Sequence, residues 1–151
     1  MRVPQFLAEQ RILFETILHP PAFTAQNRAR FLHISGNQVA KSVLLVGPRG
    51  RFLAVLPATC QIDTEKLALT LGGPVRLASD DEIADVFRDC EWGVVPPFGT
   101  LYALPTLLDD SFDPETWMVF ETNTHAEAVR LRCRDYERLE RPRRLHFSRR
   151  W

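Results

Sequence analysis

Apolar residues in this chain gather in short runs that are separated by proline, glycine and charged residues. Alternating or closely grouped apolar residues are typical of strands, whereas a spacing of three or four is typical of helices. On these grounds we predict helices over residues 3–10, 24–32, 63–71, 79–87 and 135–141. The same pattern predicts strands over residues 12–18, 42–46, 51–56, 75–77, 101–108, 117–121 and 129–133.

Turn and capping residues support several of these boundaries. The segment Gly47-Pro48-Arg49-Gly50 separates two apolar runs and predicts a hairpin, because its glycines do not have the order of a phosphate-binding P-loop. Asp63 and Ser79 stand at helix N-cap positions. Pro105 interrupts the apolar run 101–108, which predicts a strand at a sheet edge or a bulge. Strands outnumber long helices, so the sequence indicates an α/β or α+β fold with a mixed central sheet and helices outside it.

Length and composition are those of a single globular domain over residues 1–151. The chain is 45% hydrophobic and 25% charged, as is common for soluble proteins. No apolar run approaches the roughly 20 residues that cross a bilayer. The segment Met1-Arg2-Val3-Pro4-Gln5 lacks the apolar core of a signal peptide. We therefore expect a cytoplasmic protein with no membrane partner.

Charge is balanced over the whole chain but unevenly placed. The formal net charge is zero, which excludes a general coater of nucleic acid. Residues 80–127 carry 12 acidic groups and one basic group, whereas residues 130–151 carry nine arginines and three acids. Two interpretations of the arginine-rich tail, residues 142–151, stay open. It either contacts tRNA phosphates or is a solvated, partly disordered tail.

Metal and thiol chemistry find little support in the sequence. The three cysteines, Cys60, Cys90 and Cys133, form no C-x-x-C pair and fit reduced thiols in a cytosolic protein, with at least two of them buried. The four histidines lack ligand spacing with cysteine or acidic residues. We therefore expect no metal and no cofactor.

Lys41 is the first candidate for chemistry. Seventeen arginines and only two lysines, Lys41 and Lys66, supply the positive charge of the chain. Lys41 stands directly before the apolar run 42–46, at the mouth of a predicted strand. A lysine there presents a compact ammonium to a phosphate or carboxylate. The alternative is a solvated lysine at a strand end.

Two later segments complete the pattern. The segment Gly93-Val94-Val95-Pro96-Pro97-Phe98-Gly99 is a loop stiffened by two prolines and bracketed by glycines, which allow close backbone approach to a ligand. The segment Asn123-Thr124-His125 places a histidine between two predicted strands. Each segment has a plain structural alternative, namely a proline-rich turn and a loop histidine that bonds to the backbone.

Together with Val39-Ala40-Lys41-Ser42, these segments resemble the YbaK and prolyl-tRNA-synthetase-associated family of editing domains. Members of that family are hydrolases that remove wrong amino acids from tRNA, and the resemblance covers roughly residues 12–140. It implies a curved mixed central sheet, partly closed like a barrel and flanked by helices.

The resemblance also implies roles for single residues. It makes Lys41, Gly93 and His125 the candidate catalytic residues, with Lys41 holding the terminal phosphate or adenosine. Backbone groups of the loop would orient water or bind the carbonyl oxygen, and His125 would contact the amino acid or limit the pocket. A general-base role for His125 is also chemically reasonable. The implied substrate-binding residues are Lys41, Val94, Val95, Pro96, Pro97, Phe98, Gly99, Asn123 and Thr124, of which Phe98 either lines the pocket or fills the core.

The chain departs from the family pattern at two of these positions. Ser42 replaces a common threonine, which is a mild change. Asn123 stands where glycine is usual, and asparagine tolerates a left-handed backbone.

Ahead of the lysine, His33 and Ser35-Gly36 resemble the family's preceding loop. The pair Asp109-Asp110 resembles its acidic turn, for which we expect a capping or turn role.

Two functions follow from this pattern. The first is a free-standing aminoacyl-tRNA deacylase that acts on the 3′ acceptor end of a mischarged tRNA by means of a positioned water. Alanyl-tRNA(Pro) is the leading substrate, with cysteinyl, seryl and threonyl esters as alternatives. The second is a non-catalytic module of the same fold that binds tRNA or an aminoacyl-tRNA synthetase.

Overall fold

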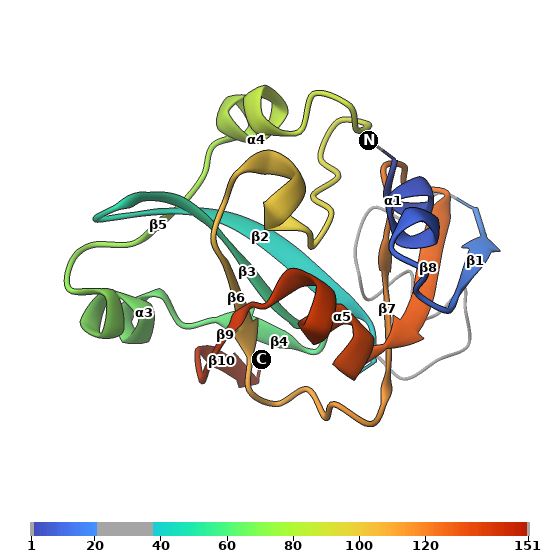
Figure 1. The fold of residues 1–151 in the computed structure, drawn as a ribbon. Coiled ribbons are helices and arrows are strands. Elements are labelled where there is room, and N and C mark those ends of the chain that lie inside the picture. The colour runs from blue at the N-terminus through green and yellow to red at the C-terminus, as the bar shows by residue number, and fades with distance from the viewer. Residues whose placement is uncertain (1, 21–37, 151) are drawn as a thin grey trace.

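The computed structural model describes residues 2–20 and 38–150. The strands are β1 (Phe14–Leu18), β2 (Ala40–Gly47), β3 (Gly50–Pro57), β4 (Cys60–Ile62), β5 (Arg76–Leu77), β6 (Thr106–Asp109), β7 (Trp117–Glu121), β8 (Glu127–Arg132), β9 (Arg143–Leu145) and β10 (Ser148–Arg150). The largest sheet is mixed and has the order β5-β2-β3-β6-β9. A second sheet is antiparallel with the order β1-β8-β7, and β4 pairs with β10 in a short ribbon (Figure 1).

Local sequence signals explain the helices. They are α1 (Val3–Glu9), α3 (Thr64–Leu71), α4 (Asp80–Val86), α5 (Cys133–Glu140) and a short 3-10 helix, η1 (Gly99–Tyr102). Asp63 caps α3 by accepting the Lys66 N–H at 3.0 Å, and Ser79 and Glu82 form the expected capping box of α4. The four helices predicted within the described residues are thus confirmed. The helix predicted over 24–32 lies outside them.

The hairpin predicted around Gly47-Pro48-Arg49-Gly50 is present. Gly47 faces Gly50, and the register continues without a bulge to the pair Ala40–Pro57. Gly50 has a φ of +113°, a conformation that glycine adopts without a steric penalty. The hairpin therefore fixes which side chains of β2 and β3 share a face.

The prediction for residues 101–108 was partly wrong. Residues 99–102 form η1, Ala103 turns in the left-handed region, and the strand begins only at Thr106. The strand lies inside the large sheet, between β3 and β9, rather than at an edge. Pro105 precedes the ladder, so its missing N–H removes no sheet hydrogen bond.

The structure contradicts one of the two interpretations of the arginine-rich tail. Residues 143–145 pair with β6, and residues 148–150 pair with β4. Phe147 is fully buried between them. The idea of a solvated, partly disordered tail is therefore wrong for residues 142–150, because this segment completes two sheets.

Asp109 is the residue that holds this segment. Its side chain is fully buried at the end of β6. It accepts hydrogen bonds from the Phe147 N–H at 3.1 Å, the Ser148 N–H at 3.0 Å and the Ser148 hydroxyl at 2.8 Å, and Ser111 donates to it as well. Burial alone would raise the pKa of Asp109, but these hydrogen bonds outweigh it and lower the pKa below its ordinary value. Asp109 thus has the turn role that the sequence suggested.

We expect Asp109→Asn to lower the free energy of unfolding by about 2 kcal/mol or more, because an amide nitrogen would face donors that now bond to a carboxylate. The lowered pKa stabilises the fold above the unfolded-state value of about 3.9, and this contribution is lost as the pH falls through the folded-state pKa. Urea unfolding between pH 7 and pH 3 should show a larger loss in the parent than in the variant, because Glu82 and Asp85 also have lowered pKa values and remain in both. Asp110→Asn, at the exposed neighbour, serves as the control and should leave stability nearly unchanged.

The main core lies between the two larger sheets. Its largest cluster combines Ala40 and Val55 of the five-stranded sheet with Phe120 and Val129 of the three-stranded sheet, and α1 and α5 close it. The sheets meet at one isolated parallel bridge, Val39–Val119. The expected mixed α/β architecture is confirmed. The described strands stay in separate sheets and do not close into a barrel, because no continuous ladder extends from that bridge.

Candidate functional site

His125 lies in the turn between β7 and β8, with only 7% of its surface exposed. Its Nδ1 atom is 3.2 Å from Oε1 of Glu121, the last residue of β7. Its Nε2 atom is 2.8 Å from the carbonyl oxygen of Trp92, in the loop after α4. The histidine therefore joins the small sheet to the loop that contains Gly93.

Both neighbours of the imidazole are acceptors. Both ring nitrogens are thus occupied by protein groups. This arrangement favours a positioning role for His125 over proton abstraction from water.

Gly93 adopts a left-handed backbone with a φ of +85°. A Cβ atom there would lie 3.8 Å from His125 Nε2, which is ordinary contact, so the conformation rather than space requires glycine. Within residues 2–20 and 38–150, the N–H groups of Gly93 and Val95 make no hydrogen bond. Gly93 is exposed and Val95 is half-buried. Both N–H groups can therefore bind a water or a carbonyl oxygen.

The rest of the loop is buried and structural. Val94, Pro96, Pro97 and Gly99 have little exposure, and Tyr136 donates its hydroxyl to the Pro97 carbonyl at 2.6 Å. Phe98 stacks edge-on against Phe6, Phe120 and Tyr136, with ring centroids 5.4 to 5.7 Å apart. Phe98 therefore fills the core rather than lining a pocket. The loop is thus anchored on both sides of its exposed N–H groups.

Lys41 lies on β2, two residues beyond the bridge to β7. Residues two apart on a strand point to the same side, and Val39 and Val119 share one buried cluster. In parallel register, Lys41 and Glu121 therefore leave their strands on the same side of the junction. Burial lowers the pKa of the half-buried Lys41 ammonium, and the nearby Cys60 raises it in part. Glu121 in turn contacts His125.

Asn123 and Thr124 support the turn around His125. The Asn123 side chain is buried, accepts the Val3 N–H at 2.8 Å and donates to Cys90 Sγ at 3.4 Å. The backbone carbonyl of Asn123 accepts the Glu91 N–H at 2.9 Å. Asn123 is not among the described residues with positive φ, so a left-handed turn is not the reason for asparagine here. The side chain instead ties the loop and α1 to this turn.

The cysteines lack the properties of nucleophiles. Burial raises the pKa of Cys90 to about 11 and that of Cys133 to about 12. Cys60 and Cys133 are buried, as the sequence suggested for two of the three thiols. The protonated, sheltered thiols of Cys90 and Cys133 are therefore poor nucleophiles.

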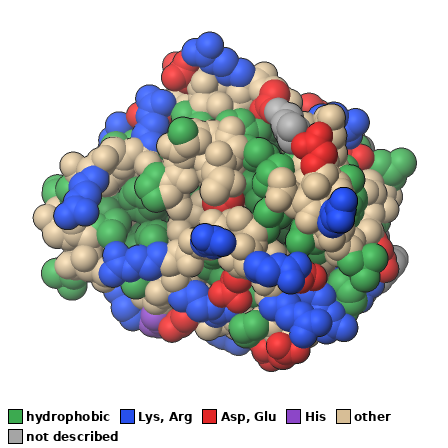
Figure 2. Space-filling view, viewed as in Figure 1, with side chains coloured by type: hydrophobic (Ala, Val, Ile, Leu, Met, Phe, Trp, Pro, Cys, Tyr) green, Lys and Arg blue, Asp and Glu red, His purple; other side chains and the backbone are tan. Residues whose placement is uncertain are grey.

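Two cavities lie near the loop and at the far end of β2. A cavity of about 200 Å³ lies between α4 and residues 90–94. A larger one of about 490 Å³ lies at the β2–β3 turn. Gly47 follows Lys41 by six positions along β2, so the two residues lie about 20 Å apart at the usual rise of a strand. Figure 2 shows this larger hollow on the left of the face, with an apolar floor and basic side chains along its margin. It lies outside the candidate site.

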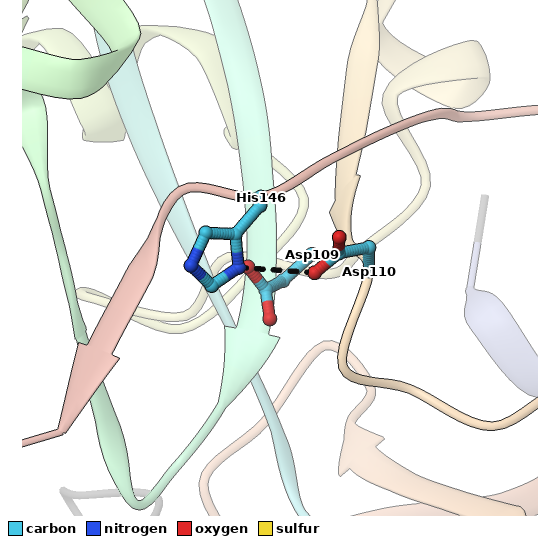
Figure 3. Close-up of side chains that lie close together, drawn as sticks. All are labelled: Asp109, Asp110 and His146. Carbon is cyan, nitrogen blue, oxygen red and sulfur yellow. Dashed lines mark hydrogen bonds and ion pairs between the residues drawn. The ribbon is translucent and has the colours of Figure 1, made fainter.

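One cluster has the residue types of a metal site. Asp109, Asp110 and His146 bring ligand atoms within 4.8 Å of one another (Figure 3). His146 Nδ1 lies 3.1 Å from Asp110 Oδ1. Both oxygens of Asp109 already accept hydrogen bonds from residues 111, 147 and 148, so they have little capacity for a cation. The cluster is therefore better explained by the hydrogen bonds that hold the C-terminal strands than by a metal centre.

The sequence did not identify two residues of this site. In the sequence Glu121 is simply the last residue of a predicted strand. Its role becomes visible only through its contact with His125 in the structure. Trp92 is 63% exposed next to Gly93, and an exposed tryptophan beside a glycine loop is a signal that could have been noticed. His33 and Ser35-Gly36 lie outside the described residues.

Comparison with known proteins bears on the family and the fold of this chain. Residues 19–139 match the family model of the aminoacyl-tRNA editing domain. Over 86 residues the chain is 31% identical to a proline–tRNA ligase of Pseudothermotoga lettingae, a match that covers 56% of this chain and 15% of that ligase. The chain thus spans a small part of the length of that curated relative.

Two solved structures share the fold. One is a protein described as hypothetical, with a TM-score of 0.87, 16% identity and coverage of 97% of this chain and 99% of the other. Another is described as a "putative trans-editing enzyme for prolyl tRNA synthetase", with a TM-score of 0.80, 24% identity and coverage of 97% and 94%. None of the helices among the described residues has the length and apolar character needed to span a bilayer. Because the family model matches most of its length, the chain belongs to the aminoacyl-tRNA editing domain family.

Proposed function

We propose that this protein is a free-standing aminoacyl-tRNA deacylase that hydrolyses the ester of a mischarged tRNA in the cytoplasm. One observation carries the proposal. The left-handed Gly93 lies beside a histidine that contacts Glu121 and the Trp92 carbonyl, and the N–H groups of Gly93 and Val95 make no hydrogen bond among the described residues. Fixed N–H donors of this kind stabilise the oxyanion that develops when water attacks an ester.

The remaining residues supply binding and orientation. Lys41 holds the terminal phosphate or adenosine as a point charge. The exposed indole of Trp92 offers a face on which the terminal adenine can stack. His125 sets the position of the loop through its contact with the Trp92 carbonyl. Water attacks the ester carbon and gives up a proton to solvent, while the carbonyl electrons move onto the oxygen at the loop N–H groups. The carbonyl then re-forms, its bond to the ribose oxygen breaks, and the ribose hydroxyl leaves with a proton from solvent.

The substrate is a tRNA that carries a small amino acid. The cavity beside Gly93 measures about 200 Å³, which is below the range of about 300–1,000 Å³ for drug-sized ligands. Alanyl-tRNA(Pro) is the leading candidate because the curated relative is a proline–tRNA ligase. Cysteinyl, seryl and threonyl esters are the alternatives. A prolyl-tRNA synthetase is the partner that would supply the mischarged tRNA.

A panel of aminoacyl-tRNAs tests the substrate class. We expect the purified protein to hydrolyse alanyl-tRNA(Pro) fastest, with slower turnover of cysteinyl, seryl and threonyl esters. Esters of phenylalanine and tryptophan should be hydrolysed most slowly, because the proposed substrate carries a small side chain. Equal rates for small and large side chains would contradict a size-limited pocket. Tight binding of every tRNA with no hydrolysis would instead support the non-catalytic module.

A further inference from the structure

The larger cavity is lined by four elements that meet at the far end of β2. The β2–β3 turn, the end of α3, residues 104–107 and the end of α5 enclose about 490 Å³. Phe52, Leu71, Leu104 and Leu107 supply an apolar floor. The charged residues of the lining are Arg49, Arg51, Arg141, Arg143 and one acid, Glu140. The cavity is therefore apolar inside and basic at its rim.

The charges around this cavity are unevenly neutralised. Arg51 lies 3.8 Å from Glu82 and 3.5 Å from Asp85. The carboxylate of Glu140 accepts hydrogen bonds from Thr100 at 2.7 Å and Thr106 at 2.9 Å.

The other three guanidinium groups have no such partners. Within the part of the chain that the structure describes, the side chains of Arg49, Arg141 and Arg143 form no ion pair and no hydrogen bond. Most arginines elsewhere in the described chain pair with an acid, as Arg76 does with Glu82. The cavity therefore collects three uncompensated positive charges from three elements.

The backbone of Arg141 strengthens this observation. Arg141 ends α5 with a φ of +51°, in the left-handed region where glycine is the usual residue. An arginine at such a position is strained, and strained residues often accompany a site that uses their side chain. Glycine at this position would relieve the strain, but it would remove the guanidinium from the cavity rim.

We propose that this cavity binds a small organic phosphate of about nucleotide size. A phosphate has several oxygens and accepts from more than one guanidinium at once. The apolar floor fits the uncharged body of the ligand, and 490 Å³ lies within the usual range of small-molecule sites. This site is about 20 Å from Lys41 along β2 and does not depend on the proposed deacylase activity.

Isothermal titration calorimetry with adenosine 5′-monophosphate tests the site. The nucleotide should bind with a sub-millimolar dissociation constant, and inorganic phosphate and adenosine should each bind more weakly. Arg49→Gln and Arg143→Gln should each weaken binding about tenfold. Arg141→Asn should also weaken it, and asparagine tolerates the left-handed backbone. Arg149→Gln, at an exposed arginine outside the cavity lining, is the matched control and should bind normally.

Several results would overturn the proposal. Circular dichroism must first show that each variant folds as the parent does. Absence of nucleotide binding at millimolar concentration, or equal binding of adenosine, would mean that the rim recognises no phosphate. Equal weakening in Arg149→Gln would indicate general charge attraction. Displacement of the nucleotide by deacylated tRNA, with the same dependence on Arg49 and Arg143, would make the cavity part of an RNA-binding surface instead.

Discussion

Replacing Lys41 with alanine is expected to lower kcat/KM for deacylation by about 100-fold, because the ammonium holds the terminal phosphate and a small misplacement of the substrate commonly costs this much. The lysine is half-buried near the start of β2, and burial lowers its pKa. A partly desolvated ammonium interacts more strongly with a phosphate than a solvated one. The measurement is the rate of release of labelled alanine from alanyl-tRNA(Pro).

Lys66→Ala provides the matched control. Lys66 is the other lysine of the chain, and it lies exposed on α3. The cap of α3 uses the Lys66 backbone N–H, which alanine keeps. This variant should retain full activity and normal folding. Near-parental rates for Lys41→Ala would exclude Lys41 from the reaction.

Gly93→Ala is expected to lower kcat by about 10- to 100-fold, since small displacements of positioning groups commonly cost this much. The φ of +85° is unfavourable for alanine. The loop would relieve this strain by rotating its backbone, which would move the Gly93 and Val95 N–H groups away from the reacting carbonyl. Single-turnover kinetics with saturating enzyme would separate this effect from weaker binding.

Gly72→Ala separates strain from function. Gly72 ends α3 with a φ of +82°, and no atom lies within 4 Å of a Cβ placed there. The two glycines thus have nearly the same φ, but only Gly93 lies beside His125. Both variants should lose about 1 kcal/mol of stability, and only Gly93→Ala should lose activity. Equal kinetics in the two variants would make the loop merely structural.

Local signals in the sequence were sufficient for the elements that they govern. Caps at Asp63 and Ser79 and the glycines of the β2–β3 turn specify their own structure within a few residues. Order and spacing of the segments around Lys41, Gly93 and His125 were sufficient to indicate the family. These features depend on contacts between near neighbours in the chain.

The remaining features depend on distant contacts. Residues 143–150 are rich in arginine, and only the buried carboxylate of Asp109 shows why they form strands. Phe98 could face a pocket or the core until its contacts with Phe120 and Tyr136 were known. The role of Glu121 follows from a bridge between two sheets and a contact with His125. No local pattern encodes such pairings.

The most direct test of the central claim is multiple-turnover hydrolysis of alanyl-tRNA(Pro) by the purified protein, with prolyl-tRNA(Pro) measured in parallel. We predict that released alanine exceeds the enzyme concentration many times over, while the prolyl ester decays only at its spontaneous rate. Alanine release at the spontaneous rate, despite measurable tRNA binding, would contradict the deacylase and leave a binding module of the same fold.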